Sequence, residues 1–406
     1  MLFLSSYFVK IFIEMDAYGI YKKLSNHHLQ QLYIEARQVM SNDIQEAKRI
    51  LRQAIEDGTN QSLHSDVNVL KIILRELDLY RQINSSDVTQ LDFTQIVNRP
   101  ISIWREGWNQ FPQSVFYLRT KLTEKIPILF VGRKLLSNVY IENKIPELHC
   151  SQIRPTMLLG IFSHTHSSQS AVTIHFYPLE ESEKQFIFNF IAQNLDKTNT
   201  EIIYPFSLLH PDTHQELCSE PDGWLFTEEM VDELAQGETH LRNYTIEMIS
   251  RGKLKVSTNS LIYDPACSTG KFLSTIKSSF PHINTIGQDL SKSMIDYVRQ
   301  HKHADETIHS DATNWPLGDR QVDLAFIRFL NSEVVTTQMA FVLFEKIVDR
   351  IKSNGQIVLF GHTPLLLSSS NFLSIRNSLK IEQCIGVSND SHGITLFQYY
   401  IIKKCV

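Results

Sequence analysis

From about residue 255 onward, short apolar runs alternate with amphipathic segments, and this alternation restricts the possible folds more than any other feature of the chain. The apolar runs predict strands at 261–264, 284–288, 306–310, 322–327, 355–360, 380–388 and 393–404. The segments between them have helical apolar spacing at 270–279, 291–301, 338–352 and near 370–379. Strands that alternate with helices form a mostly parallel sheet with helices on both faces. We therefore predict an α/β fold with a doubly wound, mostly parallel seven-stranded sheet, closed by a terminal antiparallel hairpin because no helix separates the last two strands.

The rest of the chain differs in character and carries no motif that we recognise over residues 1–200. Residues 21–86 have the spacing of amphipathic helices, and residues 100–200 contain three apolar runs and a helical stretch at 180–195. We expect four parts: a helical N-terminal region at 1–100, a small α/β or α+β region of unknown role at 101–204, a helical lid or linker at 205–254, and an α/β domain at 255–406.

Composition excludes several classes of protein. The 406 residues are 42% hydrophobic and 20% charged with a net charge of −5, which is typical of a soluble globular protein and gives no basic field for nucleic acid. The five cysteines are widely spaced without a CxxC pair, which argues against a disulfide framework or a zinc knuckle. No stretch reaches the ~18 apolar residues of a membrane span, and no cleavage site follows the apolar N-terminus. We expect a cytoplasmic protein without a membrane partner.

The loop "DPACSTG" follows the first strand of the predicted sheet. In open α/β sheets, ligands bind outside the carboxyl ends of the strands, where the winding reverses. The small residues Ala266, Ser268 and Gly270 would let a ligand approach the backbone, and Asp264 ends the strand with a carboxylate. A phosphate-binding loop would need GxxxxGK[ST] or GxGxxG, and neither is present. The carboxylate favours a ligand with a cationic group.

Two further acids follow the next two strands. Asp289 ends the second strand, where a carboxylate can accept both hydroxyl hydrogens of a ribose. Asp311 and Ala312 follow the third, where a carboxylate can accept from an exocyclic adenine amine, and Leu290 and Trp315 are positioned to flank the ring. A cation, a ribose and an adenine without phosphate describe S-adenosylmethionine.

Residues 255–406 resemble the class I S-adenosylmethionine-dependent methyltransferases, on the segments "DPACSTG", "GQDLS", "SDATNWPLGDRQVDLAF" and "GQIVLF" and the closing hairpin. The first loop of that family usually reads acidic-x-Gly-x-Gly-x-Gly, whereas Ala266 and Ser268 stand here in place of the first two glycines. The resemblance implies that S-adenosylmethionine is bound by Asp264, Ala266, Ser268, Gly270, Asp289, Leu290, Asp311, Ala312 and Arg328. The alternative is a degenerate domain of this fold that binds no cofactor.

The methyl acceptor is less constrained. Adenine-N6 DNA methyltransferases carry Asn/Asp-Pro-Pro-Tyr/Phe after the fourth strand, where this chain has "FIRFLNSE", so a nucleic-acid acceptor is disfavoured. We favour a small molecule methylated on O, N or C. Direct transfer mainly requires positioning, and a base is needed only if the acceptor must lose a proton. The candidate catalytic residues are His362 and Arg328. His362 is either the base or a loop histidine that bonds to backbone or solvent, and Arg328 alternatively binds an acidic substrate or pairs with Glu333.

Further candidates are Asn331, after the fourth strand, and Arg242 and Tyr244, which precede the first strand where this family often has a lid over the cofactor. These three are our substrate-binding candidates. His210 and His214 have metal-ligand spacing but lack an apparent third ligand, so we expect no metal. The long N-terminal half is expected to recognise substrate or form a homodimer. The alternatives are methylation of a nucleic acid, a protein or a carrier-bound substrate, and a regulatory protein that binds S-adenosylmethionine without transferring the methyl group.

Overall fold

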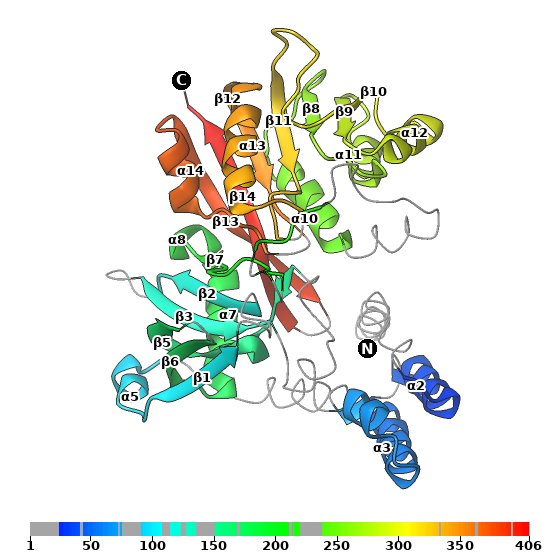
Figure 1. Cartoon of the computed structure of the whole chain (residues 1–406), viewed down its shortest axis with the longest axis vertical. Helices are drawn as coiled ribbons and strands as arrows, with labels where there is room; N and C mark the ends of the chain where they lie inside the picture. Colours follow the sequence, from blue (N-terminus) through cyan, green and yellow to red (C-terminus); the bar gives the residue numbers. More distant parts are fainter. Residues whose placement is uncertain are drawn as a thin grey trace.

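The structure, a computed structural model, describes residues 24–40, 44–71, 74, 91–107, 114–122, 127–134, 151–168, 171–210, 213, 215–219, 238–332, 334–361, 364–390 and 393–405. Figure 1 shows two β-sheets, an N-terminal one and a C-terminal one, joined by the long hairpin of β13 (Leu379–Asp390) and β14 (Gly393–Lys404). The α/β class expected from the sequence is confirmed.

The C-terminal sheet is built from alternating strands and helices. Its elements are β8 (Leu261–Asp264), α11 (Lys271–Ser279), β9 (Asn284–Asp289), α12 (Lys292–His301), β10 (Glu306–His309), β11 (Val322–Ile327), α13 (Thr337–Asp349), β12 (Ile351–Leu359), α14 (Ser369–Ile375), β13 (Leu379–Asp390) and β14 (Gly393–Lys404). The strand order is β10-β9-β8-β11-β12-β14-β13, and the short β4 (Gln152–Ile153) pairs with β14 as an eighth strand. The strands from β10 to β12 are parallel, and β14 is antiparallel to both β12 and β13.

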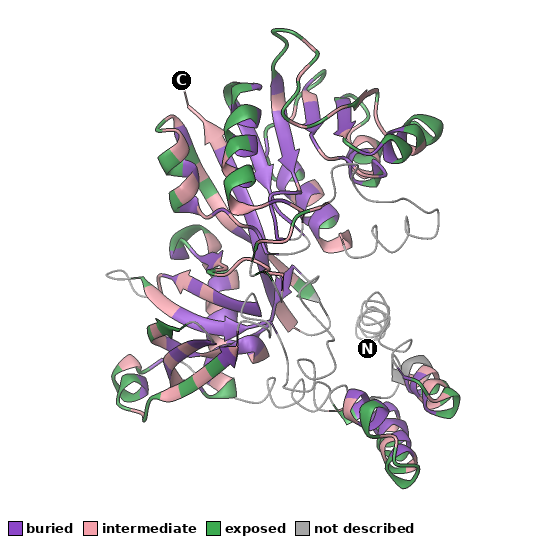
Figure 2. Ribbon diagram, viewed as in Figure 1, coloured by how far each residue is buried: buried purple, intermediate pink, exposed green. Residues whose placement is uncertain are grey.

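Helices cover both faces of this sheet, because successive side chains of a strand point in opposite directions. Ile262 of β8 packs in one apolar cluster with α10 (Thr239–Ser250), α11 and α12. Its neighbour Tyr263 packs in another cluster with α13 and α14. The strands between these layers are largely buried (Figure 2). The chain winds outward from β8 to β10 and then returns to β11, so the winding reverses between β8 and β11.

Some boundaries differ from the sequence prediction, since the helix expected near 370–379 ends at Ile375, and the clearest difference lies between α13 and β12. The helix expected at 338–352 ends at Asp349, and the strand expected at 355–360 starts at Ile351. Ile351 pairs with Val322 of β11, and Asn354 has a positive φ of 65°. The polar segment between these residues resembles a turn in sequence, and only pairing with β11 makes it part of a strand.

The N-terminal sheet is antiparallel. Its strands are β1 (Ser102–Gly107), β2 (Val115–Thr120), β3 (Ile128–Arg133), β5 (Leu158–Ser167), β6 (Ala171–Pro178) and β7 (Glu201–Ile203), in the order β1-β6-β5-β3-β2-β7. The sequence patterns predicted β3, β5, β6 and the helix α7 (Glu181–Gln193), but not β1, β2 or β7. Glu106 illustrates why: a buried carboxylate in a strand is stable only when paired, and its partner Arg133 on β3, at 2.7 Å, is distant in sequence.

Shorter elements complete the description. They are α2 (His27–Met40), α3 (Ile44–Asn60), a helix at 64–71, α5 (Phe93–Val97), the 3-10 turn η4 (Pro155–Met157) and α8 (Leu195–Thr198). The helices α2 and α3 pack around buried apolar residues that include Leu29, Tyr33 and Leu51. In the part of the chain that is described, none of the helices has both the length and the apolar character to cross a membrane.

The terminal hairpin belongs to both sheets. Ile385 of β13 and Leu396 of β14 lie in the same buried cluster as Phe188 of α7, which covers the N-terminal sheet. Leu396 and Phe397 also pair with β4. The two sheets therefore share part of their apolar core.

Candidate functional site

The loop between β8 and α11 is held against β9 by its backbone. Cys267 N–H donates to the Gln288 carbonyl at 2.8 Å, and Gly270 N–H donates to the Cys267 carbonyl at 2.9 Å. Ser268 and Gly270 have positive φ values of 52° and 68°. A Cβ on Gly270 would lie 2.7 Å from the Cβ of His303. Gly270 is thus required both for its conformation and for this close approach.

Asp289, at the end of β9, is locked onto that loop. Its Oδ2 accepts from Ser268 N–H at 2.8 Å and its Oδ1 from Ser291 N–H at 2.9 Å. Burial raises the pKa of Asp289, and the two backbone N–H groups oppose that shift by stabilising the carboxylate. The residue is only partly buried, and each carboxylate oxygen can accept more than one hydrogen bond. This orientation suits acceptance from the two hydroxyls of a ribose.

The loop after β10 carries the third acid. Asp311 is exposed, and its Oδ1 accepts from Thr313 N–H at 2.6 Å. Ala312 packs partly against the core, and Leu290 is 41% exposed. We call the edge formed by the carboxyl ends of β8, β9 and β10 and the loops that follow them the rim. Because β8, β9 and β10 are adjacent and parallel, Asp264, Asp289 and Asp311 follow the same edge of the sheet.

Asp264 is buried and forms an ion pair with Arg328. Arg328, directly after β11, donates through Nε to Asp264 Oδ2 at 2.9 Å and through Nη1 to Glu238 Oε1 at 2.6 Å. Its Nη2 also donates to the Ala266 carbonyl at 3.2 Å. The side chains of Asp264 and Arg328 are 0% and 8% exposed. Arg328 thus pairs with Asp264 and Glu238, whereas Glu333 lies outside the described residues.

Burial and the neighbouring charges shift the pKa values of the side chains in this cluster. Burial raises the pKa of Asp264 to about 6, against the opposing attraction of the Arg328 guanidinium. Burial lowers the pKa of Arg328, but the nearby carboxylates of Asp264 and Glu238 outweigh this and raise it above its ordinary value. Arg328 is therefore charged at neutral pH.

Arg242 extends the cluster from α10. Its Nη2 donates to Thr239 Oγ1 at 3.1 Å, and its Nη1 lies 3.9 Å from Glu238 Oε2. Burial lowers the pKa of Arg242. Glu238, Asp264, Arg242 and Arg328 together place two carboxylates and two guanidinium groups beside the loop.

Two further candidates, Tyr244 and Asn331, are buried. Tyr244 is buried edge-on against Phe397 and Tyr399 of β14, and its hydroxyl accepts from Gln383 Nε2 at 2.7 Å. Asn331 is 3% exposed and forms a β-bridge with Leu365, which joins the loops after β11 and β12.

His362 and His214 lie outside the described residues. Among the residues that are described, no group of three or more His, Cys, Asp or Glu side chains is arranged to hold a metal ion.

Comparison with known proteins identifies the family. Residues 262–355 match the family described as "Methyltransferase domain". The chain is also 32% identical over 257 residues to isonocardicin synthase of Nocardia uniformis subsp. tsuyamanensis. These aligned residues make up 63% of this chain and 80% of that relative. The chain belongs to the class I S-adenosylmethionine-dependent methyltransferases. The resemblance inferred from the sequence is confirmed, and S-adenosylmethionine is the cofactor of this family.

Solved structures of methyltransferases are similar to parts of the chain. The plantazolicin methyltransferase BpumL in complex with SAH is 15% identical, with 41% of this chain and 85% of that chain covered and a TM-score of 0.32. Magnesium protoporphyrin IX methyltransferase (ChlM) from Synechocystis PCC 6803 with bound SAM is 12% identical, with 45% and 86% covered and a TM-score of 0.34. TM-scores of this size add nothing to the assignment.

The site fits this cofactor chemically. The close approach at Gly270 and the partly exposed Asp289 carboxylate suit an adenosine, and the buried cluster offers both signs of charge to an amino-acid group. Sequence reasoning missed Glu238 and Gln288. Glu238 stands four residues before Arg242, a spacing that favours an ion pair on a helix, and Gln288 is a polar residue inside an otherwise apolar strand.

Proposed function

We propose that this methyltransferase transfers the methyl group to a small-molecule acceptor, on O, N or C. The observation that carries the proposal is the Asp289 carboxylate, held by Ser268 and Ser291 N–H groups beside the Gly270 loop at the carboxyl end of the sheet. Bound there, S-adenosylmethionine supplies a carbon that its sulfonium activates toward nucleophiles.

In this proposal each part of the rim has one task. Asp289 accepts from the ribose hydroxyls, while Ala266, Ser268 and Gly270 allow the close approach of the cofactor to the backbone. Asp311, Ala312 and Leu290 hold the adenine. The amino-acid end carries one ammonium and one carboxylate, which Asp264 and Glu238 on one side and Arg242 and Arg328 on the other complement in charge.

The acceptor side is the less specific part of the proposal. Asn331 and His362 belong to the loops after β11 and β12, which are joined by the Leu366 N–H to Leu330 carbonyl bond at 3.1 Å. We propose His362 as the base if the acceptor must lose a proton. The net charge of −5 and the sequence after β11 both favour a small molecule over nucleic acid.

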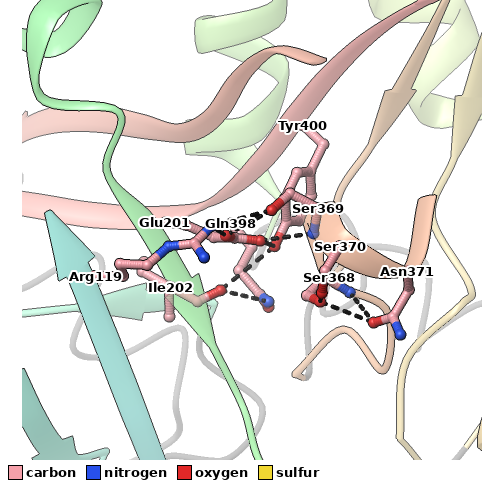
Figure 3. A network of polar contacts seen from close by, with 9 residues as sticks. All are labelled: Arg119, Glu201, Ile202, Ser368, Ser369, Ser370, Asn371, Gln398 and Tyr400. Atoms are coloured by element: carbon pink, nitrogen blue, oxygen red, sulfur yellow. Dashed lines mark hydrogen bonds and ion pairs between the residues drawn. The ribbon is translucent and has the colours of Figure 1, made fainter. Parts of the chain in front are cut away.

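We also propose that the N-terminal half contributes to the acceptor side, and Figure 3 gives the reason. Glu201 of β7 accepts from Ser369 N–H at 2.7 Å, Ser369 Oγ at 2.8 Å and Tyr400 hydroxyl at 3.0 Å, and it also pairs with Arg119. Ser369 begins α14, directly after the acceptor-side loop. A second segment of the N-terminal half acts alike, because Glu216 accepts from Thr337 N–H at 2.7 Å at the start of α13.

The domain limits 1–100, 101–204, 205–254 and 255–406, a homodimer formed through the N-terminal half, and a cytoplasmic location remain part of the proposal. Because the terminal hairpin contributes to the apolar core of both sheets, we propose that residues 255–406 carry the methyltransferase function but do not fold independently of the rest of the chain.

The test is turnover by the full chain with S-adenosylmethionine and a panel of small molecules, with the nucleoside product identified by mass spectrometry. Methyl transfer releases S-adenosylhomocysteine. Release of 5′-methylthioadenosine would instead mean that another carbon of the sulfonium is transferred, and would overturn the methyl assignment. Turnover with DNA, RNA or protein alone would overturn the acceptor class. Binding without any turnover would support the regulatory alternative.

A further inference from the structure

Three buried side chains form a row behind the loop that follows β10. Arg350 Nη1 donates to the Tyr263 hydroxyl at 2.8 Å, and the Tyr263 hydroxyl donates to Gln288 Oε1 at 2.7 Å. The exposed fractions of Tyr263 and Gln288 are 0%, and that of Arg350 is 6%. None of the three is among the residues that touch the cofactor in the proposal above.

The direction of these hydrogen bonds is fixed by chemistry. A guanidinium can only donate, so the Tyr263 oxygen must accept from Arg350 and send its own hydrogen to Gln288. Burial raises the pKa of Tyr263, so the hydroxyl keeps that hydrogen. Gln288 therefore presents its oxygen to Tyr263 and its NH₂ group to the opposite side.

The NH₂ group of Gln288 meets the loop of residues 310–314. Its Nε2 lies 2.7 Å from the Asp311 carbonyl, 3.1 Å from the Asn314 carbonyl, and 3.0 and 3.3 Å from the Ser310 hydroxyl and carbonyl. Asn314 N–H also donates to the Asp311 carbonyl, at 2.9 Å. The Asp311 carbonyl thus has two donors inside the protein, which leaves the exposed carboxylate of Asp311 as the acceptor that this residue offers outward.

We propose that Gln288 is a positioning residue that determines which purine the protein accepts in its methyl donor. It favours a purine with an amino group at C6, such as adenine, over a purine with a carbonyl at C6. The proposal rests on adenine binding at Asp311. An amino group donates to a carboxylate, whereas a carbonyl oxygen in the same place is repelled by it. The Arg350–Tyr263–Gln288 row fixes the loop so that the carboxylate, and no backbone carbonyl, faces the base.

The test is calorimetry with S-adenosylhomocysteine and S-inosylhomocysteine on the full chain. The wild type should prefer the adenine compound by about tenfold or more, the value of one hydrogen bond to a charged group. In Gln288→Glu a carboxylate would face the loop carbonyls, and the preference should fall toward one. Tyr263→Phe removes the hydroxyl that fixes the orientation of the Gln288 amide, and it should reduce the preference by a smaller factor. The backbone hydrogen bond from Cys267 N–H to the Gln288 carbonyl remains in this variant and still holds the ribose side of the site.

The matched control is Gln398→Glu. Gln398 is also a buried glutamine of this sheet, whose Nε2 donates to the Ile202 carbonyl at 3.2 Å, away from the adenine rim. This variant should leave the preference unchanged even if it unfolds more easily.

Equal weakening of both compounds by Gln288→Glu would reduce Gln288 to a structural role and overturn the inference. If Gln288→Glu does not fold, an unchanged preference in Tyr263→Phe overturns the inference in the same way. Failure of the wild type to bind either compound would instead overturn cofactor binding at this rim.

Discussion

Arg328 Nε lies 2.9 Å from Asp264 Oδ2, and this ion pair joins the ends of β8 and β11 at the point where the winding of the sheet reverses. The carboxylate that the sequence led us to assign to a cationic ligand already has a cation from the chain itself. Glu238, from the segment before the domain, holds the same guanidinium from the other side. In the binding mode proposed above, the cofactor therefore meets a charged cluster and not a single acid.

Loss of the cation should be costly. Arg328→Met leaves the buried Asp264 carboxylate without its partner, and removing one member of a buried pair costs about 3–5 kcal/mol. We expect this loss in the free energy of unfolding by urea at pH 7. The double variant with Asp264→Asn should lose less than Arg328→Met alone. As a control, Arg320→Met breaks the exposed pair with Glu306 and should cost about 0–1 kcal/mol. Equal costs for the two arginines would contradict the burial argument.

The raised pKa of Asp264 predicts a pH dependence of stability. Its folded value of about 6 exceeds the ordinary value of 3.8, so between these pH values the folded protein binds more protons at this site than the unfolded chain. By linkage, the contribution of this residue to the free energy of unfolding then falls as pH rises from about 4 to about 6. The difference amounts to about 3 kcal/mol at 1.36 kcal/mol per pKa unit.

This contribution is isolated by comparison with Asp264→Asn. The difference in urea unfolding free energy between wild type and variant should change across pH 4–7, and a constant difference would show that the carboxyl titrates normally. Asp289, whose pKa is also raised by burial, adds a slope of the same sign to both proteins and cancels in the comparison.

Asp289→Ala should weaken cofactor binding. Losing a charged acceptor for the ribose hydroxyls is expected to cost about 1.5–3 kcal/mol of binding free energy, and the loop also loses its Ser268 N–H contact. Calorimetry with S-adenosylhomocysteine measures this. Asp296→Ala, an exposed acid of α12 paired with Lys292, serves as the control and should leave affinity unchanged. An unaltered affinity in Asp289→Ala would mean that the ribose lies elsewhere.

A comparison of substitutions at Gly270 and Gly318 distinguishes the cost of backbone strain from the cost of close packing. Gly270 and Gly318 have φ values of +68° and +61°, but a Cβ on Gly318 meets nothing within 4 Å, whereas one on Gly270 meets His303 and Val298. Gly318→Ala should cost about 1–2 kcal/mol of unfolding free energy, from strain alone. Gly270→Ala should cost more and should also weaken S-adenosylhomocysteine binding. Equal costs would indicate that the loop moves without penalty.

The contact between the two sheets can be tested at Glu201. Glu201→Gln puts an amide against three donors and should lower the free energy of unfolding by about 1.5–3 kcal/mol. Hydrogen exchange at the Ser369 amide should become faster while S-adenosylhomocysteine affinity stays the same. Arg119→Gln, from a side chain that is 43% exposed, should cost under about 1 kcal/mol. If Arg119→Gln proves as costly as Glu201→Gln, the ion pair and not the buried hydroxyl contacts holds the junction.

The sequence alone determined the C-terminal α/β unit and the rim that carries its acids. Alternating apolar runs specify the strands locally, and an acid at a strand end needs no distant partner to be recognised, so Asp264, Asp289 and Asp311 were found with their places along the edge. The same local reasoning failed for β1 and β2, where Glu106 and Arg119 interrupt the apolar pattern and are stabilised by partners elsewhere in the chain.

Only the tertiary structure decided which charges meet. Arg328 pairs with Glu238 across 90 positions, and Glu201 accepts from Tyr400 across 199. The role proposed for Gln288 depends on its hydrogen bonds to Tyr263 and to the loop carbonyls, none of which its own sequence neighbourhood reveals. Apolar periodicity records which face of an element is buried, but the partner of a buried charge depends on chain segments brought together by folding. A polar pair therefore leaves little local signal in sequence, although the low dielectric of the interior makes it decisive for the site.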